Sequence, residues 1–244
     1  MKNSFFILLL LFVFSACQST LIKNDRYKVS SSATELGSIG QSTSVFNLQN
    51  DFDARTLPLL ENKIRVSVEL IPFNKRLNKF YNAKAKYNQN QPEVMYIDSL
   101  PSKPELVTIR LLDVAGFVKE LNSDYNTAVF RLLEDTQTSE IISSIAVYLP
   151  TEDIAKIRLA DSYYLTNSQD AKYTLSLYKQ AKKIETIDLN AGTEVGYRLS
   201  HFCWAATERG KWYIADMTEG SSRCKGNTES RISEKKKSKS LYRM

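Results

Sequence analysis

Few side chains in this 244-residue sequence could do bond-making chemistry, namely one histidine and three cysteines: His201, Cys17, Cys203 and Cys224. His201 and Cys203 are two residues apart in a segment expected to be a strand, so their side chains would share a face. An imidazole beside a thiol is a pairing used in nucleophilic catalysis. A catalytic thiol needs a partly exposed, electropositive setting, whereas Cys203 is flanked by two aromatic residues. We therefore expect no catalytic residue, and the balance favours a protein that is not an enzyme.

Metal centres and nucleotide cofactors are not expected either. A metal site needs three or four ligands, and the chain has a single histidine. Phosphate-binding loops need glycines that follow a strand, and Gly37-Ser38-Ile39-Gly40 lies in a Ser-rich stretch instead. The sequence contains no Gly-x-Ser-x-Gly motif of a serine hydrolase. A lone His201 is then more typical of a hydrogen-bonded strand residue than of a general base.

The N-terminus has the pattern of an export signal. Lys2 is followed by ten consecutive apolar residues, Phe5 to Phe14, and then by Ser15 and Ala16 before Cys17. Ten helical residues span about 15 Å, half of the roughly 30 Å hydrocarbon core, which is too short for a membrane anchor. The length suits the apolar region of a signal peptide. The segment Phe14-Ser15-Ala16-Cys17 resembles the lipobox of bacterial lipoproteins.

This resemblance implies that residues 1–16 are a cleaved signal peptide and that Cys17 is acylated, with palmitate a typical chain. Such lipids would anchor the protein stably to a membrane. Gln18 and Ser19 follow the cysteine without an aspartate, which resembles lipoproteins sorted to the outer membrane. We expect an outer-membrane anchor with the chain facing the periplasm rather than the cell surface. The alternative is an ordinary secretory leader with an incidental cysteine.

The two remaining cysteines, Cys203 and Cys224, predict a disulfide. An even pair of thiols in an oxidising compartment is expected to be bridged. By the chain-entropy estimate, such a bridge would contribute about 3 kcal/mol. It would pin the C-terminal end of the fold.

The formal net charge of +6 is concentrated at the C-terminus. Residues 225–244 hold seven basic and two acidic side chains, whereas residues 1–224 hold 26 basic and 25 acidic ones. A nucleic-acid-binding domain needs its cations on a folded face that follows the phosphates, so we expect no nucleic-acid partner. The tail, with Lys235-Lys236-Lys237, reads as disordered and predicts at most a weak contact with an anionic lipid surface.

Apolar patterning predicts the elements of the folded region. Period-2 alternation or apolar runs indicate strands over 64–71, 106–112, 141–149, 155–165, 172–189, 193–207 and 211–217. Helical spacing indicates helices over 74–87, 114–121 and from 123 or 124 to 134, with Asp113 as the N-cap of the second. Thr151-Glu152-Asp153 also reads as a helix start, so the strand at 155–165 could open with a helical turn.

The predicted fold class is α+β, with an N-terminal strand and helix portion followed by a C-terminal antiparallel β-meander packed on helices. The predicted organisation is a signal peptide (1–16), a lipidated Cys17 with a flexible Ser-rich tether (17–44), a globular domain (45–224) and a basic tail (225–244). The proline-rich stretch 88–104 is a candidate boundary inside the domain.

Aromatic residues on the later strands are the remaining functional signal. They define a candidate surface for a ligand or partner: Tyr197, His201, Trp204, Trp212 and Tyr213. Two hypotheses follow. The first is a non-catalytic binding or assembly module of the envelope that contacts another envelope protein. The second is a small-ligand-binding or enzymatic domain with a pocket near His201, Tyr197 and Glu194. The closing hairpin, Tyr197 to Met217, resembles the last two strands of NTF2-like domains, which implies such a pocket.

Overall fold

A computed structural model of the chain describes residues 19–29, 34–42, 52–84, 91–168 and 172–232. It is dominated by one large antiparallel β-sheet, with 45% of residues in strands and 22% in helices. The predicted α+β class is therefore wrong. The helices are short and lie against the sheet, and strands from the N-terminal part of the chain belong to the same sheet as the later ones.

Nine strands form the main path of the sheet. In spatial order they are β1 (Ser19–Ile22), β2 (Asp25–Val29), β11 (Thr193–Ala206), β7 (Glu140–Tyr148), β6 (Glu105–Leu111), β5 (Ile64–Pro72), β8 (Ser162–Asn167), β9 (Tyr173–Lys179) and β10 (Lys182–Asp188). Three more lie off the path, since β12 (Trp212–Glu219) pairs with β11, and β3 (Ile39–Ser42) pairs with β7 and β4 (Phe52–Thr56).

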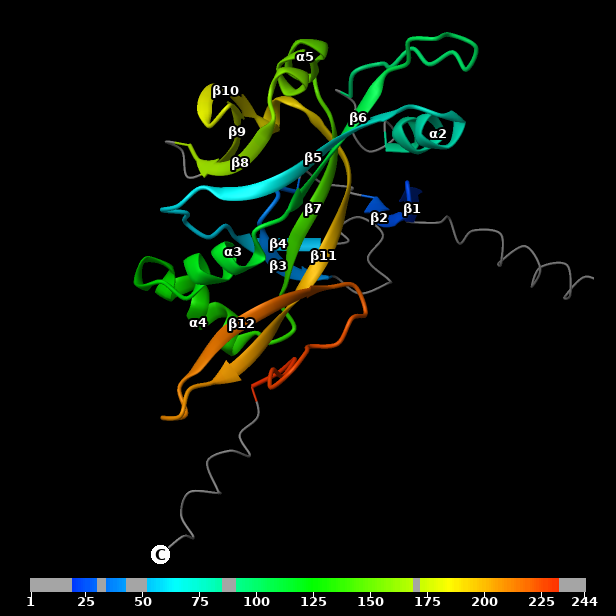
Figure 1. Ribbon diagram of the computed structural model, residues 1–244. Coiled ribbons are helices and arrows are strands. Elements are labelled where there is room, and N and C mark those ends of the chain that lie inside the picture. The colour runs from blue at the N-terminus through cyan, green and yellow to red at the C-terminus, as the bar shows by residue number, and fades with distance from the viewer. Residues whose placement is uncertain (1–18, 30–33, 43–51, 85–90, 169–171, 233–244) are drawn as a thin grey trace, which may run out of the picture.

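Strand β11 organises the sheet (Figure 1). One of its edges pairs with β7 from Thr193 to His201, while its other edge pairs first with β2 and then with β12. Its neighbours thus come from the N-terminus, the middle and the C-terminus of the chain. This order is not the sequential one of a meander, so that part of the prediction is wrong as well.

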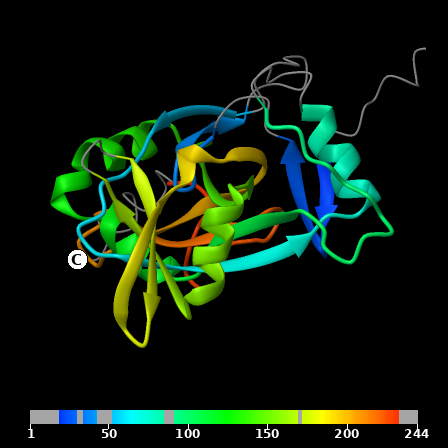
Figure 2. The same cartoon turned by 90° about the horizontal axis from the view of Figure 1, so that it is seen from above.

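Helices cover the two faces of the sheet unequally. The main core lies under α3 (Val114–Leu121), α4 (Thr127–Asp135) and α5 (Thr151–Leu159), which bury Phe117, Leu133 and Ile157 against it. On the opposite face, α2 (Lys75–Lys84) packs Phe80 and Tyr81 onto the β1–β2 end of the sheet. Figure 2 shows α2, β1 and β2 together at one side of the molecule, away from α3 and α4. The rest of that second face carries no helix in the described part of the chain.

Several local predictions are confirmed. Strands β5, β6, β7, β11 and β12 and helices α2, α3 and α4 lie where the patterns place them, within a few residues. Asp113 caps α3, accepting a hydrogen bond from the Gly116 backbone N–H at 2.8 Å. Gly210 has a φ of +77° in the hairpin between β11 and β12, as a tight turn requires.

The tether predicted for residues 17–44 is wrong for the residues in it that the structure describes. Segments 19–22, 25–29 and 39–42 are strands β1, β2 and β3 of the sheet. Three of their apolar side chains are buried: Ile22, Tyr27 and Ile39 are 2%, 3% and 0% exposed, whereas Leu21 is 40% exposed. Burial of these side chains and ladder hydrogen bonds to β11 and β7 offset the chain entropy that a Ser-rich segment would otherwise keep. Cys17 and Gln18 lie outside the described residues.

The stretch 88–104 does not divide the domain, because the strands on either side of it, β5 and β6, pair directly from Val66–Leu111 to Pro72–Glu105. Two strand boundaries were also wrong. The segment expected as one strand over 172–189 is the hairpin of β9 and β10, turned at Gln180 and Ala181, both with positive φ. The segment 155–165 is split between α5 and β8, since acidic residues in the first turn and basic ones in the last stabilise the helix.

The C-terminal end of the described chain is attached to the sheet. Cys203 and Cys224 form the predicted disulfide. Beyond it, Glu229 exchanges two backbone hydrogen bonds with Trp204, at 2.7 and 2.8 Å, and Ile232 packs on the main core. The tail predicted as disordered is therefore ordered over 225–232, while 233–244, with its lysine run, lies outside the described residues.

Candidate functional site

The five residues predicted as an aromatic surface do not share one. Tyr197 and Trp204 are each 1% exposed and belong to the main core, where their rings meet Phe52 and Phe130 at centroid distances of 5.9 and 5.7 Å. Trp212 is half-buried against the same core. Tyr213 is the one exposed residue of the five, at 39% exposure.

His201 lies at a small polar pocket next to the disulfide. Its Nε2 is 2.7 Å from the hydroxyl of Thr218, directly across the β11–β12 pair. The pocket, of about 450 Å³, is lined by His201, Ser221, Ser222, Arg223, Cys224, Thr228 and Ser230. Tyr197 and Glu194, which the pocket hypothesis joined to His201, do not line it. The two sulfur atoms and an imidazole nitrogen lie within 4.8 Å of one another, but the sulfurs are bonded together as a disulfide and are not free as ligands.

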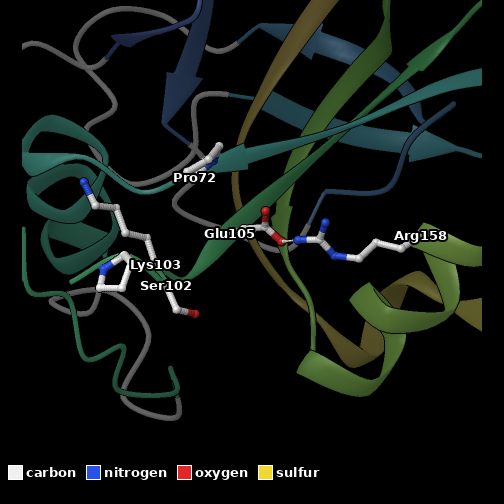
Figure 3. A pocket seen from close by; sticks show the side chains of 6 residues that line it. Pro72, Ser102, Lys103, Glu105 and Arg158 are labelled. Atoms are coloured by element: carbon white, nitrogen blue, oxygen red, sulfur yellow. Dashed lines mark hydrogen bonds and ion pairs between the residues drawn. The ribbon is translucent and has the colours of Figure 1, made fainter.

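A larger hollow lies between the 91–104 segment and α5. Two adjoining hollows of about 450 and 500 Å³ share Ser102, Lys103, Glu105 and Arg158 in their walls, so we treat them as one groove, the α5 groove. Arg158, from α5, forms an ion pair with Glu105, at the start of β6, across the groove, as Figure 3 shows. Tyr148 and Ile154 contribute to the same walls.

Side-chain and backbone contacts hold the 91–104 segment in place. Tyr81 donates a hydrogen bond to the Pro92 carbonyl at 2.7 Å, and the Phe73 N–H bonds the Pro104 carbonyl at 2.8 Å. Asp98 accepts from Tyr96 and lies 3.5 Å from the ammonium of Lys103. The hydrogen bond from Tyr96 holds the pKa of the exposed Asp98 below its usual range. The segment is therefore attached to the rest of the fold at both ends, and Asp98 links its middle to its C-terminal end.

This fixed segment points apolar side chains outward. Met95, which lines the α5 groove, is 80% exposed, and Ile97 and Leu100 are 45% and 46% exposed. Leu159, one residue beyond Arg158 at the end of α5, is 61% exposed. Of these four side chains, Met95 lies in the wall of the groove, and the other three lie on the two elements that border it. Neighbouring exposed apolar side chains mark interaction surfaces more often than scattered single ones do. Sequence reasoning missed this site because the prolines of 88–104 were interpreted as a linker.

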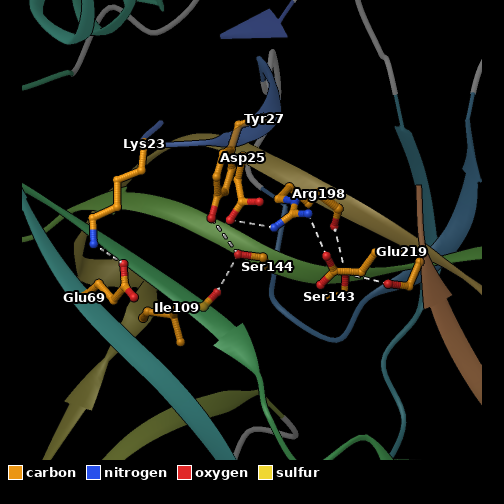
Figure 4. Close-up of polar contacts among 10 residues, drawn as sticks. Lys23, Asp25, Tyr27, Glu69, Ile109, Ser143, Ser144, Arg198 and Glu219 are labelled. Atoms are coloured by element: carbon orange, nitrogen blue, oxygen red, sulfur yellow. Dashed lines mark hydrogen bonds and ion pairs between the residues drawn. The ribbon is translucent and has the colours of Figure 1, made fainter. Parts of the chain in front are cut away.

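A polar network occupies the middle of the second sheet face (Figure 4). Arg198 on β11 forms ion pairs with Asp25 at 2.9 Å and with Glu219 at 2.6 Å. Tyr27 shares a hydrogen bond with Ser144 at 2.9 Å, and Ser144 donates to the Ile109 carbonyl at 3.1 Å. Desolvation raises the pKa of Tyr27, so its hydroxyl stays protonated at neutral pH. The network joins β2, β7, β11 and β12 structurally and leaves no unpaired nucleophile.

A buried acid and a buried base meet where β11 begins. Glu194 accepts hydrogen bonds from the backbone N–H of Thr34, at 2.6 Å, and from its hydroxyl, while Lys84 donates to the Glu194 carbonyl. Burial raises the pKa of Glu194 to about 8 and lowers the pKa of Lys84. Both side chains are enclosed, with 9% and 3% exposure, so no substrate reaches them. Their shifted pKa values are a property of folding and not of an open active site.

None of the described helices is both long enough and apolar enough to cross a bilayer. Comparison of the chain with protein-family models, with curated proteins and with solved structures finds no match. The features of the site itself, above all the α5 groove, are therefore what supports a function.

Proposed function

We propose that this chain is a lipid-anchored protein of the cell envelope, held to the periplasmic face of the outer membrane by an acylated Cys17. Its folded part would be a non-catalytic binding or assembly module. The support for the address is the lipobox-like segment at Cys17 together with the Cys203–Cys224 disulfide, a bond typical of oxidising compartments.

The observation that carries the binding role is the α5 groove with the exposed Met95 in its wall. Met95 and Ala155 face the groove from its two sides. The occupant that fits is an apolar segment of another envelope protein, because most charged groups of the walls are already paired: Glu105 with Arg158, and Lys103 with the nearby Asp98. Glu93 is the wall residue for which no ion pair is formed among the described residues. A partner would gain affinity by burying apolar area there, in the manner of interface hot spots.

The anchor is tested by Cys17→Ser. We expect this variant to lose incorporation of a labelled palmitate analogue and to move from the membrane fraction to the soluble periplasmic fraction. Two acyl chains or more are needed for stable attachment, so the loss of all of them should release the protein. Retention of the serine variant in membranes with an unchanged label would contradict the proposed anchor.

The groove is tested by Met95→Asp with Ala155→Arg, which places charge on both walls. We expect a protein crosslinked to the wild type in intact cells to be lost from this variant, since an unpaired charge in a buried interface costs several kcal/mol. Ala128→Arg on α4 is the matched control, because Ala128 is also an exposed helical alanine but lies away from the groove. Equal recovery of that protein with both variants would place its binding elsewhere.

A further inference from the structure

The pairing register fixes which side chains share the second face of the sheet. Residues directly opposite one another in neighbouring strands point to the same side. Arg65 on β5 lies opposite Tyr164 on β8, and Lys183 on β10 lies opposite Tyr178 on β9. Arg110 on β6 lies opposite Ser67, two residues along β5 from Arg65 and therefore on the same face. The alternate residues Val66, Ile109 and Leu165 fill the main core on the other side.

Several cations on this face have no acidic partner within the part of the chain that the structure describes. Among the described residues, no carboxylate forms an ion pair with Lys63, Arg65, Arg110 or Lys183. The acids of the same face are already engaged. Glu69 pairs with Lys23 at 2.6 Å, and Arg198 takes both Asp25 and Glu219. Asp188, at the far end of β10, accepts a hydrogen bond from the Asn190 N–H at 2.9 Å.

Two tyrosines lie among these cations. The rings of Tyr164 and Tyr178 meet edge to face with centroids 5.0 Å apart. The ammonium of Lys63 lies over both, 4.4 and 4.2 Å from the two centroids. Both rings are half-buried, so each keeps an open portion beside a positive charge. A tyrosine with one side dry and one side wet suits the apolar face and hydroxyl rim of a sugar ring.

We infer that the residues Lys63, Arg65, Arg110, Tyr164, Tyr178 and Lys183, which we call the cationic strip, bind an acidic polysaccharide. The strip crosses five neighbouring strands, from β10 to β6, so at about 4.8 Å per strand it is about 19 Å long. A small anion cannot reach both ends, whereas a linear polyanion lying across the strands can. The overall charge balance of residues 1–224 conceals this local excess.

A glycan fits the strip better than a membrane surface does. Among the described residues of these five strands, Ile184 on β10 is the one large aliphatic side chain that is exposed, at 41%, and lipid insertion would need several such groups. The choice of a glycan over a nucleic acid rests on the proposed envelope location. The strip itself does not depend on the α5 groove, which lies on other residues, so the two ideas can fail separately.

The test measures binding of fluorescein-labelled polygalacturonate, a carboxylated glycan, to the full mature protein. We expect binding that weakens as salt is added. The affinity should fall at least about tenfold in Arg65→Glu with Arg110→Glu, because the two substitutions together lower the net charge of the strip by four units. Lys119→Glu with Arg131→Glu, on α3 and α4, changes net charge equally away from the strip and should bind like the wild type. Since every variant keeps residues 233–244, their lysines contribute equally throughout.

Three further arms make the outcome decisive. Tyr178→Ala should weaken polygalacturonate binding without changing net charge, and neutral dextran should not bind. Equal affinities in the two charge-reversal variants, or no binding of polygalacturonate at all, would overturn the proposal. So would strip-dependent binding to phosphatidylglycerol vesicles without binding to the glycan, which would assign the strip to lipid. Met95→Asp with Ala155→Arg should leave glycan binding intact, which separates failure of this inference from failure of the groove.

Discussion

Replacing Glu194 with glutamine should leave stability nearly unchanged at pH 5 and should stabilise the protein at pH 8 and above. Burial raises the pKa of Glu194 to about 8, whereas an unfolded glutamate titrates near 4.5. Below pH 4.5, Glu194 is protonated in both the folded and the unfolded chain, so its ionisation does not reduce the free energy of unfolding. As pH rises from about 4.5 to 8, the unfolded chain releases a proton that the folded chain keeps, so the free energy of unfolding falls.

The size of that loss is about 5 kcal/mol for a shift of this extent. Glutamine resembles the protonated acid in shape and cannot ionise, so Glu194→Gln should remove the loss. Urea unfolding at a series of pH values measures the difference between wild type and variant. Glu93→Gln, at an exposed position, is the control and should change the curve little. A difference that does not grow with pH, or a variant less stable than the wild type at pH 8, would show that the carboxylate and Lys84 act as a stabilising ion pair.

Among substitutions of polar residues, we expect Glu120→Ala to destabilise the protein most. Its carboxylate is 1% exposed and accepts the backbone N–H of Glu61 at 2.6 Å, the Asn62 amide at 2.8 Å and the Tyr125 hydroxyl at 2.7 Å. Burial raises the pKa of Glu120, but these hydrogen bonds outweigh it and hold the pKa below its ordinary value. The bonds tie the chain before β5 to helix α3.

Glu120→Ala would leave those donors without an acceptor, at about 1–3 kcal/mol for each that stays buried. We expect a loss of about 4 kcal/mol in the free energy of unfolding at pH 7, measured by urea titration. Glu120→Gln keeps one acceptor oxygen and should lose less. The wild type should also lose stability in acid as Glu120 becomes protonated, since its folded pKa is the lower one, and Glu120→Ala should lack that component. A loss below 1 kcal/mol in the alanine variant would contradict this role.

The elements that the sequence predicted well are those whose signal is local. The alternation at 64–71 and 106–112 and the cap at Asp113 depend on neighbouring residues, and these segments fold as expected. Strands β1, β2 and β3 are short and polar. Strand β2 exists because β11 pairs with it and β3 because β7 pairs with it, each at least 100 residues further along the chain, and β1 pairs in turn with β2. Pattern within a Ser-rich segment cannot reveal such a partner.

The prediction of an aromatic surface was wrong for a geometric reason. In a regular strand, Tyr197 and Trp204, seven residues apart, would point to opposite faces. Register shifts after Arg198 and after Cys203, where Ser143 on β7 and Ala215 on β12 are skipped, change which residues of the neighbouring strands lie beside β11, and both rings lie in one core. The α5 groove was missed because it joins a proline-rich segment to a helix about 50 residues further on, a contact that only the β5–β6 pairing and the fold around it create.

The two proposed surfaces would bind different partners of an envelope module. The α5 groove would hold a protein segment through apolar contacts, and the cationic strip would hold an acidic glycan through charge. The first should be little affected by salt, whereas the second should weaken with it. A lipid at Cys17 would keep both near the membrane.

The most direct test of the central claim is site-specific photocrosslinking in intact cells, with a photoreactive amino acid placed at position 95, 155 or 128 in turn. The account predicts that positions 95 and 155, on the two walls of the α5 groove, capture the same protein, and that position 128 does not. Capture of that protein from position 128 as efficiently, or capture of none from positions 95 and 155, would contradict the assignment of the groove as the partner-binding site.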